Sequence, residues 1–150
     1  MFGKAVLASV LAFSSVGAGV ANACSITSFR STGSDVDRAL DQHAWEINNY
    51  NAVCSKLNQA NAALWINGMA TVLDGKAIVW ASASLRDKNL DVSTAASGGR
   101  AIIINPSPSM DVARRILPEV INDAVNSMDI DKAIASLNAS RKKVRAAYQK

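Results

Sequence analysis

Two apolar runs joined by a short polar turn occupy the middle of the chain, between Leu64 and Leu85. Asp74-Gly75 lies at their centre, and an Asp-Gly pair between apolar runs is a strong signal for a two-residue hairpin turn. Such a turn fixes the register, with Leu73 opposite Lys76 and every further pair following from it. The pattern therefore predicts a long β-hairpin whose two faces differ in chemistry.

One face of this hairpin is non-polar and half Gly or Ala. We expect it to be the core face, and it consists of Leu64, Ile66, Gly68, Ala70, Val72, Ala77, Val79, Ala81, Ala83 and Leu85. The other face is mixed, and it carries Trp65, Asn67, Met69, Thr71, Leu73, Lys76, Ile78, Trp80, Ser82 and Ser84. Either a helix crosses this mixed face, or the face binds a ligand or partner. The candidate binding residues in the second case are Trp65, Asn67, Met69, Trp80 and Ser82.

Ahead of the hairpin, apolar or near-apolar residues recur at alternating spacings of four and three, at Val36, Leu40, His43, Ile47, Tyr50, Cys54 and Leu57. This spacing predicts one amphipathic helix of about seven turns. Ser34 and the acidic residues after it are a plausible helix start. We expect the helix to pack on the small-residue face of the hairpin, with His43 at the edge of the core.

The segments after the hairpin predict one more strand and two helices. Residues 86–99 fit a loop, a short helix or a further strand. The continuous apolar run 101–104 predicts a fully buried strand, which ends at Asn105-Pro106. Helices are expected after Ser109 and after Asp129, and Pro118 either kinks the first of them or begins a new helix.

The order of elements predicts an α+β fold. A long N-terminal helix packs on a small antiparallel sheet, made of the central hairpin plus one or two strands, and two C-terminal helices follow.

The first 23 residues have the pattern of a secretory signal peptide. Lys4 precedes an apolar, small-residue segment, and Ala21-Asn22-Ala23 forms an A-x-A cleavage site. A retained membrane anchor is the alternative. We therefore expect a signal peptide at 1–23, a single domain at 24–150 without a membrane span, and a periplasmic or secreted location.

Cys24 and Cys54 are the only two cysteines of the chain. An exported protein meets an oxidising compartment, so an even count predicts one disulfide. In the predicted long helix, Cys54 lies far from the helix start. A Cys24–Cys54 disulfide therefore requires residues 24–33 to run back along this helix in an extended conformation, as an added edge strand. The alternative is a lipid attached to Cys24.

The formal net charge of +4 is concentrated near the end of the chain. The last ten residues include Arg141, Lys142, Lys143, Arg145 and Lys150. This cluster is either a solvated helix end, where cations are favourable, or a docking patch for an anionic partner. No aromatic residues are interleaved near the patch in the way that nucleic-acid binding favours, so we expect no nucleic-acid partner.

No motif for catalysis is present, and we expect no metal and no cofactor. His43 is the only histidine and lacks companions for a metal site or a Cys–His pair. Ser97-Gly98-Gly99-Arg100 is either a plain turn or a cradle for an anion. The candidate carboxylates for a hydrolase are Asp87, Asp91, Asp111 and Glu119, but no pattern brings two of them together.

The sequence therefore favours an exported, non-enzymatic binding protein that acts on a protein or an anionic envelope component. It would bind through the mixed hairpin face or the basic last helix. A small carboxylate-dependent hydrolase and a small-ligand sensor or carrier are the alternatives.

Overall fold

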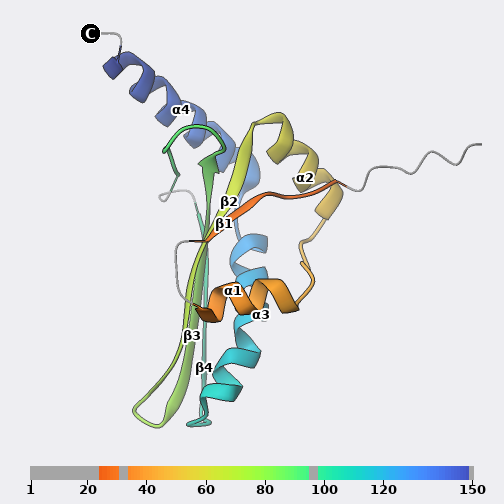
Figure 1. Ribbon diagram of the computed structural model, residues 1–150, viewed down its shortest axis with the longest axis vertical. Coiled ribbons are helices and arrows are strands. Elements are labelled where there is room, and N and C mark those ends of the chain that lie inside the picture. Colours follow the sequence, from red (N-terminus) through yellow and green to blue (C-terminus); the bar gives the residue numbers. More distant parts are fainter. Residues whose placement is uncertain (1–23, 31–33, 95–97, 149–150) are drawn as a thin grey trace, which may run out of the picture.

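The computed structural model describes residues 24–30, 34–94 and 98–148, so the predicted signal peptide lies outside the described residues. The described residues form an α+β fold, in which helices pack with a mixed four-stranded sheet (Figure 1). The elements are β1 (Ser28–Arg30), α1 (Ser34–Gln42), α2 (Tyr50–Gln59), β2 (Ala62–Leu73), β3 (Lys76–Asp87), β4 (Gly99–Asn105), α3 (Met110–Asn126) and α4 (Ile130–Tyr148). The strand order is β1-β2-β3-β4, so β1 and β4 form the edges.

The central hairpin, formed by β2 and β3, has the predicted register. Leu73 pairs with Lys76, and the ladder continues without a slip to Ala62 opposite Asp87. Asp74 and Gly75 both have positive φ, at 49° and 71°, as a two-residue hairpin turn of this kind requires. The turn chemistry alone therefore determined which residues share a face.

The small-residue face of the hairpin is the core face. Ala77, Val79 and Leu85 are fully buried, and α3 packs across β2, β3 and β4. A Cβ atom added to Gly68 would lie 2.9 Å from the carbonyl oxygen of Trp80 and 3.5 Å from Leu117 Cδ1. The small side chains thus let α3 approach the sheet closely. Each large apolar side chain buried between the layers contributes about 1.5–3 kcal/mol.

The prediction of one long helix is wrong, because α1 and α2 are separate and residues 43–49 between them are not helical. Asn122 and Asn126 of α3 bond the backbone of this connection. Asn122 Oδ1 accepts from the Glu46 amide at 3.3 Å, and Asn126 Oδ1 accepts from the Asn48 amide at 2.8 Å. These bonds replace those of a continuous helix. His43 is exposed in the connection, so its predicted place at the core edge is also wrong.

The sheet is mixed rather than wholly antiparallel. β1 runs parallel to β2, with Phe29 level with Trp65, whereas β2, β3 and β4 are antiparallel. The expected edge strand near Phe29 is therefore present. It leads from Cys24, which lies at disulfide-bonding distance from Cys54 of α2 with a Cα–Cα distance of 6.0 Å. A bonded Cys24 sulfur has no thiol left to carry a lipid.

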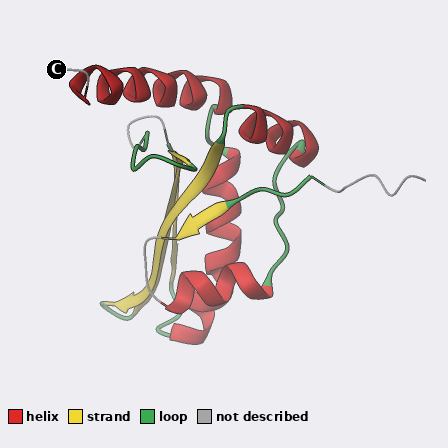
Figure 2. Cartoon of the chain, turned by 45° about the horizontal axis from the view of Figure 1, so that its top comes forward, coloured by secondary structure: helices red, strands yellow, loops and turns green. Residues whose placement is uncertain are grey.

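Both C-terminal helices begin where the sequence predicts. The Ser109 hydroxyl accepts from the Val112 amide at 3.4 Å, and Asp129 Oδ1 accepts from the Lys132 amide at 3.0 Å. Pro118 lies inside α3, which continues through it. Figure 2 shows α4 running across one end of the sheet while α1 and α3 lie against its core face.

Candidate functional site

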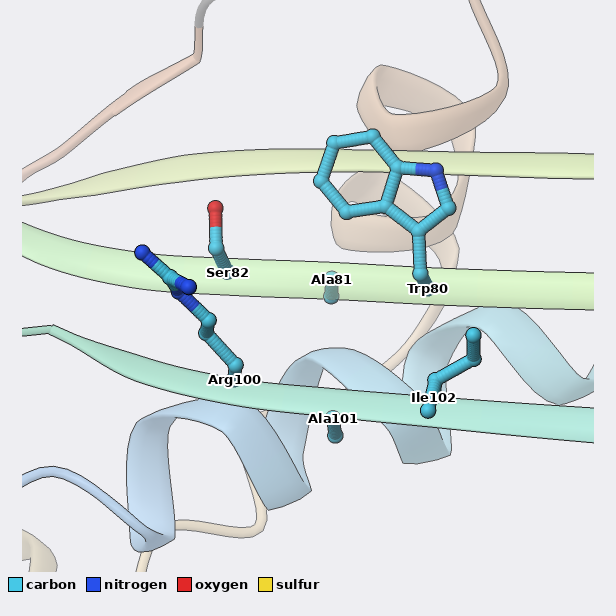
Figure 3. Close-up of a pocket in the computed structure, with 6 residues that line it drawn as sticks. All are labelled: Trp80, Ala81, Ser82, Arg100, Ala101 and Ile102. Atoms are coloured by element: carbon cyan, nitrogen blue, oxygen red, sulfur yellow. The ribbon is translucent and has the colours of Figure 1, made fainter.

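The mixed face of the sheet is not covered by any described helix, and we call it the open face. Figure 3 shows the side chains of Trp80, Arg100 and Ile102 on the near side of β3 and β4, with α3 behind the strands. The open face consists of Trp65, Asn67, Met69, Thr71 and Leu73 of β2, Lys76, Ile78, Trp80, Ser82, Ser84 and Arg86 of β3, and Arg100, Ile102 and Ile104 of β4. The two-residue period of the strands brings these side chains to one side.

Large apolar side chains of the open face are accessible to solvent. The exposed fractions are 46% for Met69, 58% for Leu73, 63% for Ile102 and 60% for Ile104. Met69 pairs with Trp80, and Trp80 pairs with Ile102, so Met69, Trp80 and Ile102 form a row across the sheet. A contiguous apolar row rimmed by polar groups is typical of an interaction site.

The prediction that 101–104 is a fully buried strand is wrong. Ile102 and Ile104 face the open side, whereas Ala101 and Ile103 are partly buried against the core. A continuous apolar run looks the same in sequence whether one or both faces of its strand are covered. Sequence reasoning consequently missed Ile102 and Ile104, and it considered Arg100 only as part of a turn or an anion cradle. The only available signal was the flanking Gly98-Gly99 and Pro106.

A shallow groove of about 540 Å³ lies over β3 and β4. Trp80 and Ile102 form its apolar part, and the Ser82 hydroxyl and the Arg100 guanidinium form its polar part (Figure 3). A smaller hollow of about 130 Å³ adjoins it, lined in part by Trp65 and Asn67. The groove combines an aromatic ring, which can pack against an apolar side chain, with a guanidinium, which can bind a carboxylate or another anionic group.

Trp65 is already engaged within the protein. The Arg86 guanidinium lies 4.5 Å from the centroid of the Trp65 ring and 5.4 Å from that of Phe29. Arg86 also pairs with Asp91 at 2.7 Å. Of the two tryptophans predicted as a platform, only Trp65 stacks with a cation from the described part of the chain, and Trp80 does not.

The open face is positively charged. Its strand positions hold Lys76, Arg86 and Arg100 and no carboxylate. Asp91 neutralises Arg86. Among the described residues, Lys76 and Arg100 have no ion-pair partner. The face therefore carries two uncompensated cations, which lie on opposite sides of the Met69–Trp80–Ile102 row along the strand direction.

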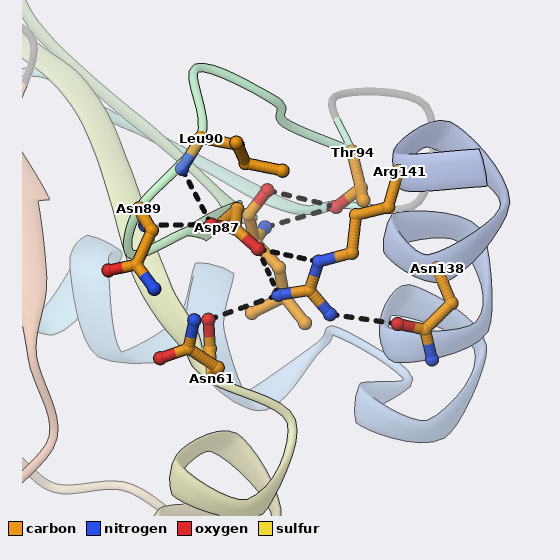
Figure 4. Close-up of polar contacts among 8 residues, drawn as sticks. Asn61, Asp87, Asn89, Leu90, Thr94, Asn138 and Arg141 are labelled. Carbon is orange, nitrogen blue, oxygen red and sulfur yellow. Dashed lines mark hydrogen bonds and ion pairs between the residues drawn. The ribbon is translucent and has the colours of Figure 1, made fainter. Parts of the chain in front are cut away.

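The basic end of α4 divides into two kinds of residue. Arg141 is mostly buried, and its Nε donates to Asp87 Oδ2 at 2.6 Å (Figure 4). Lys142, Lys143 and Arg145 are exposed. The structure thus engages Arg141 in holding α4 against the end of β3, and leaves the other three predicted residues accessible.

Asp87 is the centre of this anchoring network. Burial opposes its ionisation, but the amides of Asn89 and Leu90 donate to Oδ1 at 2.7 and 2.6 Å, and Arg141 binds Oδ2. These donors outweigh burial and hold the pKa of Asp87 below its ordinary value of 3.8. Arg141 also donates to the Asn61 carbonyl at 3.1 Å. Asp87 is thereby occupied in structure and is not free to act on a substrate.

Two other predicted carboxylates are in ion pairs, Asp91 with Arg86 and Asp111 with Arg114. In the described ranges, no group of three or more His, Cys, Asp or Glu side chains could hold a metal ion. In the segment 97–100, considered as a plain turn or an anion cradle, Ser97 lies outside the described residues. A Cβ on Gly98 would lie 2.2 Å from the Ala83 carbonyl oxygen, and one on Gly99 would lie 1.8 Å from that of Ala124. The two glycines therefore serve close backbone packing.

No helix within the described part of the chain has the length and apolar character needed to cross a membrane. Comparisons with models of known protein families, with curated proteins and with solved structures found no match for this chain.

Proposed function

We propose that the protein is an exported, non-enzymatic binding protein that recognises a protein or envelope component through the open face of its sheet. The observation that carries this proposal is the exposure of Met69, Ile102 and Ile104 beside Trp80. Exposed apolar area is unfavourable in water unless a partner covers it, and such rows on monomers are commonly functional.

Export is part of the proposal and rests on the N-terminal pattern together with the cysteine pair. Disulfides persist in oxidising compartments, and Cys24 follows directly after the predicted cleavage site. A periplasmic or secreted location is consistent with both features.

The competing surface is the basic end of α4, where Lys142, Lys143 and Arg145 are exposed. Exposed cations attract anionic partners weakly and from a distance. This end of α4 also offers some apolar area, because Leu90, Val144 and Tyr148 line a cavity of about 480 Å³ beside Arg145. The open face carries the larger set of exposed aliphatic and thioether side chains, Met69, Leu73, Ile102 and Ile104, together with its own cations. We therefore place the partner there.

Site-specific crosslinking in intact cells tests this proposal. A photoreactive amino acid replaces Ile102 on the open face, Lys143 on the basic end of α4, or Asn51 as an exposed control on α2. We expect a discrete crosslinked species from position 102 that is lost on adding Trp80→Ala. The same species from position 143 and none from 102 would refute the proposal.

A small-ligand carrier is the second candidate, and the groove over Trp80, Ser82 and Arg100 favours it. Ligand pockets usually bury most of a small molecule, whereas this groove is open along the sheet. An extended partner fits an open groove better than a small ligand does.

A further inference from the structure

β4 is an edge strand with a free outer side. It occupies the end of the strand order, and no other described strand pairs with it beyond β3. Natural edge strands are usually shortened, bulged, charged or interrupted by proline, which prevents another chain from pairing with them. The opposite edge, β1, has only three residues. β4 has seven residues, pairs with β3 without a slip, and carries one charge, on Arg100.

The side chains of β4 alternate between the two faces of the sheet. Arg100, Ile102 and Ile104 face the open side, next to the groove that contains Trp80. An added strand would lie about 4.8 Å from β4, with its own side chains directly opposite those of β4. Its residues would therefore meet a cation first and then two isoleucines, at every second position.

The charge of the open face indicates what the added strand carries. Along the strand direction, Arg100 lies before Ile102 and Ile104, and Lys76 lies beyond the Ile78–Ile104 pair on the other side. Opposite charges directly across a ladder stabilise pairing, whereas like charges destabilise it. An acidic residue opposite Arg100 meets that cation directly. A second one, six positions along the added strand, lies on the same face as Lys76, with β4 between them and level with Pro106 just beyond the end of β4. The complementary pattern is acidic-x-apolar-x-apolar-x-acidic, which reads the same in either strand direction.

A second copy of this chain fits the edge less well. Antiparallel pairing of two β4 strands about Ile102 would place Arg100 of each copy opposite Ile104 of the other. Neither guanidinium would then gain a carboxylate. An anionic lipid surface would meet the cations but leave the backbone groups of the edge unpaired.

We propose that β4 accepts an extended acidic segment of a partner protein as a fifth strand of the sheet, with the pattern acidic-x-apolar-x-apolar-x-acidic. This inference rests on the proposed function, because it names the class of partner that the open face binds. Backbone hydrogen bonds along the edge supply affinity, and the contacts with Arg100, Ile102 and Ile104 supply specificity.

The direct test is binding of a labelled synthetic peptide with the core Glu-Thr-Val-Thr-Val-Thr-Glu to the disulfide-bonded protein, measured by fluorescence anisotropy. We expect saturable binding that weakens about tenfold or more in Arg100→Ala, because a charge-assisted pair is lost. Arg115→Ala, an exposed cation on α3, serves as the matched control and should bind like wild type. Arg100→Glu should prefer a peptide whose glutamates are replaced by lysines.

Strand addition makes a second prediction that charge alone does not. Only alternate amides of the peptide face β4, so N-methylation of one alternate set should abolish binding while methylation of the other set leaves it intact. Equal binding of both methylated peptides, or binding that ignores Arg100→Ala, would overturn the inference. Circular dichroism melts would confirm that each variant remains folded.

If a second copy of the chain or an anionic lipid surface occupies the β4 edge instead, the same variants give different results. Concentration-dependent dimerisation that Arg100→Ala leaves intact and Ile102→Lys removes would assign the edge to a second copy and overturn the inference. Arg100-dependent binding to phosphatidylglycerol vesicles, without peptide binding to about 1 mM, would overturn it in favour of a lipid surface. Failure with the peptide while position 102 still crosslinks in cells would overturn this inference and leave the proposed function standing.

Discussion

Two ion pairs of similar length but different burial allow a sharp test of what anchors α4. Arg141 Nε lies 2.6 Å from Asp87 Oδ2, and Arg86 Nη2 lies 2.7 Å from Asp91 Oδ1. The side-chain exposures are 13% and 5% in the first pair but 26% and 92% in the second. Asp87→Asn and Asp91→Asn each remove one negative charge and nearly preserve shape.

We expect Asp87→Asn to lower the free energy of unfolding by about 2–3 kcal/mol. Breaking a buried ion pair costs about 3–5 kcal/mol when the remaining charge stays buried. Here Arg141 keeps its bonds to the Asn61 carbonyl and to Asn138 Oδ1, which moderates the loss. The asparagine oxygen can still accept from the two amides. Asp91→Asn should cost about 0–1 kcal/mol, as exposed pairs do.

Urea unfolding at pH 7 measures both changes. With a slope of about 2 kcal/mol per molar urea, the midpoint should fall by about 1–1.5 M for Asp87→Asn and by about 0.5 M or less for Asp91→Asn. Adding Arg141→Met to Asp87→Asn should cost less than the sum of the single changes, because the two side chains interact. Equal midpoints for the two asparagine variants would refute the assignment of Asp87 as the anchor.

The remaining predictions concern pH, packing and the disulfide. Because the pKa of Asp87 is lowered, its stabilisation is complete above the ordinary value of 3.8 and is lost as pH falls through the lower folded value. The midpoint difference between wild type and Asp87→Asn should therefore shrink below pH 3.8, and a constant difference would contradict the assignment. Gly99→Ala should cost about 3 kcal/mol or more, since its Cβ would lie 1.8 Å from a carbonyl oxygen of α3, and calorimetry should show a melting temperature well below wild type. Ala81→Phe should also lower the melting temperature, because this side chain is 1% exposed between the sheet and α3, and an unchanged value would contradict its place in the core. Cys24→Ser with Cys54→Ser should cost about 2–4 kcal/mol, since the bond closes a loop with a sequence separation of 30, and a reductant should then no longer affect stability.

The hairpin could be predicted from the sequence because its determinants are local. Asp74-Gly75 requires positive φ at two consecutive positions, and that requirement sets the register of β2 and β3. Once the register is set, the period of two assigns every side chain to a face. The starts of α3 and α4 were predictable for the same reason, since Ser109 and Asp129 bond amides only three residues away.

The break between α1 and α2 could not be predicted in this way. The spacing of apolar residues from Val36 to Leu57 remains helical across the break, and Ile47 is still buried within it. The break depends on Asn122 and Asn126 of α3, which lie 76 and 78 residues beyond the amides they bond. A local pattern contains no information about such distant partners.

The candidate site, like the fold, was predictable only where local sequence determines it. The sequence by itself determined that Trp65, Met69 and Trp80 share a face of the hairpin. It could not determine whether a helix covers that face, because the number of helices does not say on which side each one packs. The tertiary structure decided this by placing α1 and α3 against the small-residue face and α4 across one end of the sheet. The same arrangement left β4 at an edge, so a run that looked fully buried presents Ile102 and Ile104 to solvent.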